Sequence, residues 1–88
     1  MTVRVLVPQQ LRNYTGGLTA VHATGVTVDD ALTNVDLQFK GLKFRVIDEQ
    51  GRIREHMRIF VDGARVRDVR TKVKADAEIH IFGALSGG

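Results

Sequence analysis

The sequence predicts an α+β domain in which one helix packs on one face of a mixed sheet of four or five strands. Three observations predict this arrangement. Two segments with alternating hydrophobic residues come first, a segment with helical periodicity follows them, and several short extended segments come after it. The chain has 88 residues, which is enough for one domain.

The first two segments are predicted strands. "TVRVLVP" (residues 2–8) alternates valines with other residues, and Pro8 ends it because proline cannot donate a hydrogen bond to a sheet. "NYTGG" then supplies turn residues. "LTAVHATG" is the second strand, with Val21 and Ala23 facing inward. We therefore expect a hairpin with a long connection.

The next segment changes its hydrophobic period and predicts the main helix. Thr27 suits the N-cap, Asp29 and Asp30 fall in the first turn, where the helix dipole favours anions, and Gly41 suits the C′ position. Four hydrophobic residues fall on one helical face: Val28, Leu32, Val35 and Phe39.

The second half of the chain predicts short strands. "DEQG" is a turn between short extended pieces, and "MRIFVDGARVR" is a strand, a turn and a further strand, with Phe60 pointing away from Ile59 and Val61. "DVRTKVKAD" is predicted as a connection with one helical turn. "AEIHIF" is the last strand, with Ile79 and Ile81 on the face opposite to His80 and Phe82.

The end of the sequence predicts a different kind of segment. Glycines at positions 83, 87 and 88 make "GALSGG" a poor candidate for packing. We expect a folded domain over residues 1–83 and a projecting, flexible tail over residues 84–88.

Composition excludes several classes of function. The chain has no cysteine, so disulfides, thiolate metal sites, iron–sulfur clusters and a cysteine nucleophile are excluded. The net charge is +3, with arginine prevailing over lysine, and this indicates an acidic partner. The basic residues are scattered and aromatic residues are few, so we do not expect nucleic acid as a partner.

The sequence also indicates the cellular compartment and argues against a metal site. No apolar run is long enough to span a bilayer, and the first residues show no signal-peptide pattern, so we expect a cytoplasmic protein without a membrane partner. His22, His56 and His80 are too far apart for a compact metal motif. We expect His80 to point outward in a structural or solvent-exposed role.

These features together resemble the ubiquitin-like sulfur carrier proteins. The resemblance rests on the hairpin and helix at the start, on "RIFVDG", and on a closing strand followed by "GG". It covers nearly the whole chain and implies the β-grasp fold. "EHMRIFVDGARVRD" and "LRNYTGG" are most similar to the carriers of cysteine biosynthesis. One departure is Asp76, which replaces a glycine in the turn before the last strand; aspartate tolerates the left-handed backbone at a cost of about 1 kcal/mol.

The resemblance implies a chemical role for the last two residues. In this family a partner enzyme of the ubiquitin-activating type adenylates the terminal glycine carboxylate with ATP and magnesium, and sulfur then replaces AMP to give a thiocarboxylate. Here that residue is Gly88, with Gly87 beside it. The carrier itself is not an enzyme and is expected to bind no metal or cofactor. Further partners implied are a sulfur donor enzyme and a sulfur-acceptor synthase.

The resemblance also implies a surface for these partners. It makes the first, third and last strands neighbours, which places Leu6, Phe60 and Phe82 together on the face away from the helix. We expect docking through this surface, with Arg58 beside it and Leu85 in the tail. The alternative is that residues 43–51 cover these side chains.

A run of arginines follows the same surface in sequence: Arg58, Arg65, Arg67 and Arg70. It is either a solvated surface or a device that steers the carrier to acidic partners.

Two further functions remain open on the sequence. One is a protein modifier that forms an amide between Gly88 and lysines of target proteins. The other is a simple binding module, for which Gly88 is dispensable.

Overall fold

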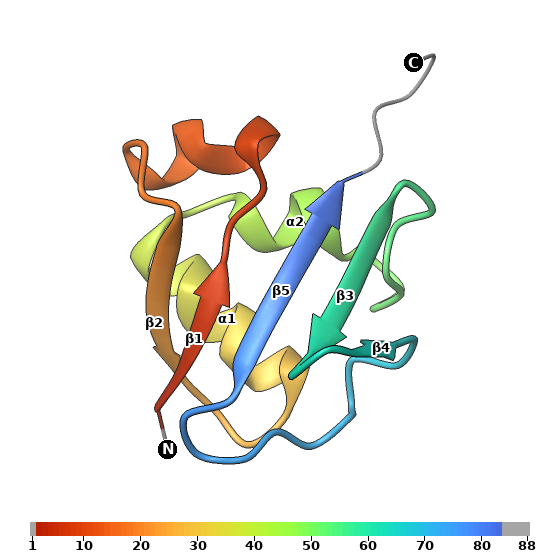
Figure 1. Cartoon of the computed structure of the whole chain (residues 1–88). Coiled ribbons are helices and arrows are strands. Elements are labelled where there is room, and N and C mark those ends of the chain that lie inside the picture. The colour runs from red at the N-terminus through yellow and green to blue at the C-terminus, as the bar shows by residue number, and fades with distance from the viewer. Residues whose placement is uncertain (1, 84–88) are drawn as a thin grey trace.

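The computed structural model of the chain describes residues 2–83, which form one mixed sheet with helices on one side (Figure 1). In this part of the chain the strands are β1 (Thr2–Leu6), β2 (Ala20–Thr24), β3 (Met57–Val61), β4 (Ala64–Val66) and β5 (Glu78–Gly83). The helices are the 3-10 helix η1 (Gln9–Thr15), α1 (Val28–Gln38) and the short α2 (Leu42–Val46).

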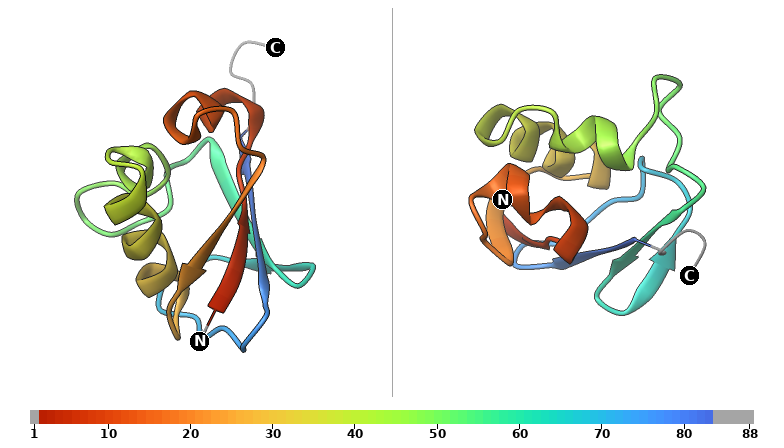
Figure 2. Two further views of the ribbon diagram at one scale, coloured as in Figure 1. Left: turned by 90° about the vertical axis from the view of Figure 1, so that its left-hand side faces the viewer. Right: turned by 90° about the horizontal axis from the view of Figure 1, so that it is seen from above.

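The sheet has the order β2-β1-β5-β3-β4, so the first, last and third strands are neighbours, as the resemblance implied. β1 and β5 are parallel, and the other three pairs are antiparallel. α1 and α2 lie together on one face of this sheet, and η1 lies at one end of it (Figure 2). The predicted α+β class with a β-grasp arrangement is confirmed.

The core lies between the helices and the sheet. The inward side chains of the three central strands are almost completely buried: Val3, Val5, Ile59, Ile79 and Ile81. Val28, Leu32 and Val35 of α1 meet them and are also fully buried, whereas Phe39 is only partly buried at the edge of the core. The alternation of the strands and the period of the helix therefore predicted the core correctly.

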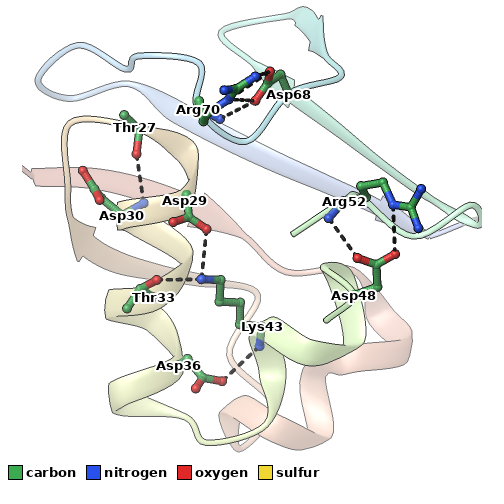
Figure 3. Close-up of polar contacts among 10 residues, drawn as sticks. All are labelled: Thr27, Asp29, Asp30, Thr33, Asp36, Lys43, Asp48, Arg52, Asp68 and Arg70. Atoms are coloured by element: carbon green, nitrogen blue, oxygen red, sulfur yellow. Dashed lines mark hydrogen bonds and ion pairs between the residues drawn. The ribbon is translucent and has the colours of Figure 1, made fainter. Parts of the chain in front are cut away.

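The N-terminus of α1 is closed by two sets of hydrogen bonds. Thr27 is the N-cap, as predicted, and its Oγ1 accepts a bond from the Asp30 N–H at 3.0 Å (Figure 3). The N–H groups of Val28 and Asp29 donate to carbonyls of the connection at residues 67–77, at 3.0 and 2.8 Å. The helical turn predicted in that connection is wrong, because the segment runs across the helix end and satisfies its free donors.

The C-terminus of α1 leads directly into α2. The C-cap is Phe39, one residue earlier than predicted, and Gly41, with φ of 94°, precedes α2. One carboxylate oxygen of Asp36 accepts the N–H groups of Gly41 and Lys43, at 3.0 and 3.2 Å. The left-handed glycine is therefore required by the turn between the two helices.

α2 was not predicted, because the sequence suggested an extended piece before "DEQG". Leu42 and Val46 lie one helical turn apart and are both fully buried, so a single turn places two side chains in the core. Lys43 links α2 to α1, because its Nζ forms an ion pair with the Asp29 carboxylate at 2.9 Å and donates a hydrogen bond to Thr33 Oγ1 at 2.7 Å (Figure 3).

η1 was also not predicted and fills the long connection of the opening hairpin. Leu11 is buried, and so is Thr15, whose Oγ1 lies 3.1 Å from the Arg12 carbonyl and 2.9 Å from the Leu18 carbonyl. A segment of this length gives no clear helical period, so tertiary packing decides its structure.

Two aspartates adopt the left-handed backbone in turns. Asp76 has φ of 64°, as expected where the family has glycine. Asp62 has φ of 48° and is followed by Gly63 with φ of 88°, the geometry of the predicted Asp-Gly hairpin turn. The Asp62 carboxylate also accepts the N–H of Glu78 at 2.9 Å, which ties this turn to β5.

The predicted tail at residues 84–88 lies outside the described residues, and so do Leu85, Gly87 and Gly88. Within residues 2–83, no helix combines the length and the apolar character needed to cross a membrane.

Candidate functional site

The open face of the sheet carries an aromatic cluster at the centre of β3 and β5. Because side chains alternate along a strand, His80 and Phe82 point away from the core that contains Ile79 and Ile81. Phe60 of β3 is directly opposite His80 in the antiparallel register. The three aromatic side chains of the open face are therefore held together by strand pairing.

The aromatic rings are in direct contact. The Phe60 and Phe82 ring centroids are 5.3 Å apart with an interplanar angle of 88°, an edge-to-face pair. The His80 and Phe82 rings are stacked with centroids 3.9 Å apart. They line a shallow groove of ≈ 550 Å³ together with Arg58, Gly63 and Glu78. We call this the aromatic groove.

The aromatic groove is open to solvent. Phe82 is a large apolar side chain, yet 44% of its surface is exposed to solvent. Residues 43–51 belong to the helix side, where Val46 and Ile47 are part of the core (Figure 2). The alternative in which residues 43–51 cover Phe60 and Phe82 is therefore wrong. Leu6 pairs with His80 in the β1–β5 ladder and is partly buried at the edge of the same surface.

A second groove adjoins the first along β3 and β4. It has a volume of ≈ 290 Å³, and four arginines line it: Arg54, Arg58, Arg65 and Arg67. We call it the arginine groove. Arg58 lines both grooves. The strand register explains the position of Arg65, which is directly opposite Phe60 and therefore on the open face.

Arg70 does not belong to the arginine groove, contrary to the sequence grouping. Its guanidinium binds the Asp68 carboxylate at 2.8 Å (Figure 3). This contact, chiefly its hydrogen bond, lowers the pKa of Asp68 to about 2 and raises the pKa of Arg70. The charge of Arg70 is thus largely compensated, whereas within residues 2–83 no ion pair compensates the arginines of the groove.

The C-terminal end of β5 lies beside both grooves. Gly83 pairs with Met57, and the next pair along the ladder is Phe82 with Arg58. A Cβ atom on Gly83 would collide with the side-chain amide of Gln10, which comes from η1. The last residue of β5 therefore lies between η1 and the beginning of β3 (Figure 1).

Sequence reasoning missed two members of this surface. His80 points outward, as predicted, but its stacking on Phe82 was not predicted, and its position two residues before Phe82 on one strand was the available signal. Arg54 lies in an irregular segment, and the sequence carries no signal that it meets Arg65 and Arg67. Among residues 2–83, no group of histidine, cysteine and acidic residues is arranged to hold a metal ion.

Comparison with known proteins agrees with this arrangement. The chain matches the ThiS family over residues 5–88. It is 28% identical to the sulfur carrier protein CysO of Mycobacterium tuberculosis, over the full length of both chains. One chain of the BexX/CysO complex from Amycolatopsis orientalis superposes with a TM-score of 0.91 at 30% identity, covering 98% of this chain and 99% of that one.

A modifier protein is similar as well. The small archaeal modifier protein 1 of Methanosarcina acetivorans superposes with a TM-score of 0.81 at 25% identity, covering 99% of this chain and 96% of that one. The family match nevertheless spans nearly every residue, the β-grasp sheet has the expected strand order, and the relatives with the higher identities are carriers. This chain belongs to the ThiS family of ubiquitin-like sulfur carriers.

Proposed function

We propose that the carboxyl group of Gly88 is the position at which this carrier is loaded with sulfur. The observation that carries the proposal is the match to the ThiS family, which runs to residue 88, together with full-length similarity to a sulfur carrier. β5 ends at Gly83, five positions before Gly88, so in the sequence the proposed loading site follows directly after the strand that carries His80 and Phe82.

The chemistry requires activation by another protein. An α-carboxyl group has a pKa of about 3.3–3.7, so it is ionised at neutral pH and is a poor electrophile. In the proposed first step, a carboxylate oxygen attacks the α-phosphorus of ATP and pyrophosphate leaves. In the second, a sulfide sulfur attacks the carbonyl carbon and AMP leaves, giving the thiocarboxylate. Where the donor is a persulfide, its attack displaces AMP to give an acyl disulfide, and a thiol of the donor enzyme then cleaves the S–S bond, releasing the thiocarboxylate and forming a disulfide with the donor. Magnesium and ATP are bound by the adenylating enzyme.

Glycine at positions 87 and 88 suits this reaction. The adenylating enzyme has to bring the carboxylate against a phosphate in a narrow site. A residue without Cβ allows close approach of the backbone and tolerates unusual dihedral angles. We expect side chains at either position to slow adenylation by restricting the bound pose.

The aromatic groove is the proposed docking surface for the adenylating enzyme and for the acceptor synthase. It combines exposed apolar rings with strand-fixed geometry, and rigid aromatic side chains are frequent anchors in protein interfaces. The sulfur acceptor is proposed to be of the cysteine-biosynthesis type, because "EHMRIFVDGARVRD" and "LRNYTGG" resemble those carriers.

The mass of the protein isolated from its native host tests the proposal. We expect a fraction of the chains to be heavier by the difference between one sulfur and one oxygen atom, and the deletion of Gly88 to abolish that fraction. Unchanged sulfur loading after the deletion would contradict the proposal and favour a simple binding module.

A protein modifier is the second candidate, supported by the similarity to the small archaeal modifier protein 1. It shares the activation step but ends in an amide with a lysine of a target. Isolation of lysine conjugates that carry the Gly88 carboxyl group, without the thiocarboxylate, would decide for the modifier.

A further inference from the structure

The arginine groove presents positive charge that the described part of the chain does not compensate. The ion pairs within residues 2–83 involve Arg4, Lys43, Arg52 and Arg70, and none of the groove arginines takes part in them. Glu55 also lines the groove, but Arg58 binds the carbonyl of Glu55, at 2.6 Å, rather than its carboxylate.

Two of the groove arginines are held in place by the backbone. Arg54 Nε donates to the Phe44 carbonyl at 2.7 Å, and its guanidinium lies 4.5 Å from the centre of the Phe44 ring. Arg58 Nη1 donates to the Met57 carbonyl at 2.9 Å, in addition to that of Glu55. These two guanidinium groups are therefore positioned before any partner binds, which lowers the entropy lost on binding.

The other two arginines of the groove, Arg65 and Arg67, repel each other electrostatically. Partial removal from solvent, followed by the charges of Arg67 and Arg58, lowers the pKa of Arg65. Arg67 directly follows β4 and lines the same groove as Arg58. Like charges held close together are unfavourable, and a bound anion relieves that repulsion.

The surroundings of the arginine groove indicate which kind of anion it binds: an acidic protein segment rather than an isolated phosphate. It is continuous with the aromatic groove through Arg58, and Ile53, Met57 and Val66 line its wall. An isolated phosphate would leave the apolar rings of the adjoining aromatic groove unused. A protein segment with apolar residues beside acidic ones matches both grooves, because carboxylates pair with arginine in a planar, bidentate manner.

We propose that the arginine groove binds an acidic segment of the enzyme that loads the tail, while the aromatic groove binds apolar residues next to that segment. This inference rests on the proposed function. It assigns Arg54, Arg58, Arg65 and Arg67 to recognition of the partner and gives them no part in the chemistry at Gly88.

The first experiment measures adenylation of the carrier by its adenylating enzyme. The variant Arg65→Gln/Arg67→Gln loses two charges from the groove. The control Lys40→Gln/Arg45→Gln loses two charges from exposed positions on the helix side, so both have the same net charge. We expect the KM for the carrier to rise about tenfold in the groove variant, with kcat unchanged and a weaker dependence on salt, because charged groups at an interface act mainly on encounter.

The outcomes separate this inference from the proposed function. Wild-type carrier that forms no acyl-adenylate would overturn the function of Gly88. If the wild-type carrier forms the acyl-adenylate and the groove variant and the control have equal KM values, only the proposed role of the arginine groove would be overturned. The native backbone amide spectrum of both variants establishes that they are folded.

A second experiment tests the groove without the enzyme. A synthetic peptide of leucines followed by glutamates is titrated into the full chain, and a matched peptide with glutamines in place of glutamates is the control. We expect saturable shifts of the amide signals of residues 54–58 and 65–67 with the first peptide only. Saturable binding of a single-stranded DNA oligonucleotide without binding of the peptide, or a dimer that Arg65→Gln/Arg67→Gln dissociates, would contradict the proposal.

Discussion

The two faces of the sheet are built from the same strands but differ in their chemistry. On the helix side, Ile79 and Ile81 are at most 1% exposed, whereas Phe82, one residue further along β5, keeps 44% of its surface exposed. The helix side is occupied by α1 and α2, the open face carries the aromatic groove, and the arginine groove adjoins it along β3 and β4. The comparison indicates that one face maintains the fold and the other is available for partners.

The largest expected effect is on the helix side. Ile79→Ala removes a completely buried side chain from the centre of the sheet, and we expect the free energy of unfolding to fall by about 2–5 kcal/mol. Urea denaturation followed by circular dichroism measures it. His80→Ala, the neighbour on the open face, is the matched control and should cost clearly less. Equal losses for the two variants would break the distinction between the faces.

The next effect belongs to the open face. Phe60→Ser removes one ring of the edge-to-face pair, and we expect a loss of about 1–2 kcal/mol in binding of the adenylating enzyme, with the fold retained. Steady-state adenylation kinetics give the change in KM, and the amide spectrum gives the state of the fold. Leu37→Ser, an exposed apolar residue on α1, is the control away from this surface. Adenylation kinetics equal to those of wild type would argue against docking at the aromatic groove.

A smaller effect is expected where the helix layer is capped. Thr27→Ala removes the acceptor of the Asp30 N–H and should lower the free energy of unfolding by about 1 kcal/mol. Thr27→Ser keeps the acceptor and should recover most of it. Urea denaturation measures both variants, and sulfur loading should be the same in both. A loading defect in Thr27→Ala at a temperature where it is fully folded would show that the helix side also takes part in function.

The smallest effect concerns Arg70, which is paired with Asp68, whereas the groove arginines form no ion pair within the part of the chain that the structure describes. The hydrogen bonds and charge of Arg70 lower the pKa of Asp68 from 3.8 to about 2 in the folded chain, so the ionised carboxylate favours folding above that range. This contribution is lost as the pH falls from the unfolded pKa through the folded one. We expect the stability difference between wild type and Asp68→Asn to shrink over this interval.

Urea midpoints at a series of acidic pH values measure this difference. The pair is exposed, so the difference should be small even at neutral pH and should decrease further in high salt. A difference that stays constant between neutral pH and about 2 would contradict the assignment of the lowered pKa to Asp68.

Hydrophobic periodicity was sufficient for the elements that form the core. The alternation in β1 and β5 and the i, i+4, i+7 spacing of α1 placed Val5, Ile79 and Leu32 correctly. The short elements were missed for a common physical reason. η1 and α2 are too short to show a period, and their structure depends on buried contacts such as those of Leu11 and Val46.

The candidate site was predictable only in part. Alternation alone placed Phe60 and Phe82 on the open face, and the resemblance supplied the strand order that brings them together. The stacking of His80 depends on rotamers, and the arginine groove depends on the β3–β4 register and on an irregular segment that carries Arg54. The position of Arg70 outside the arginine groove also could not be predicted, because it depends on the ion pair with Asp68, two residues earlier.

The most direct test is to locate the sulfur atom. After incubation with the adenylating enzyme, ATP, magnesium and a sulfur donor, trypsin releases the peptide of residues 75–88, since no lysine or arginine follows Lys74 in the sequence. Fragmentation of this peptide should assign the replacement of oxygen by sulfur to Gly88. Sulfur assigned to any other residue, or equal loading of a chain that lacks Gly88, would contradict the account.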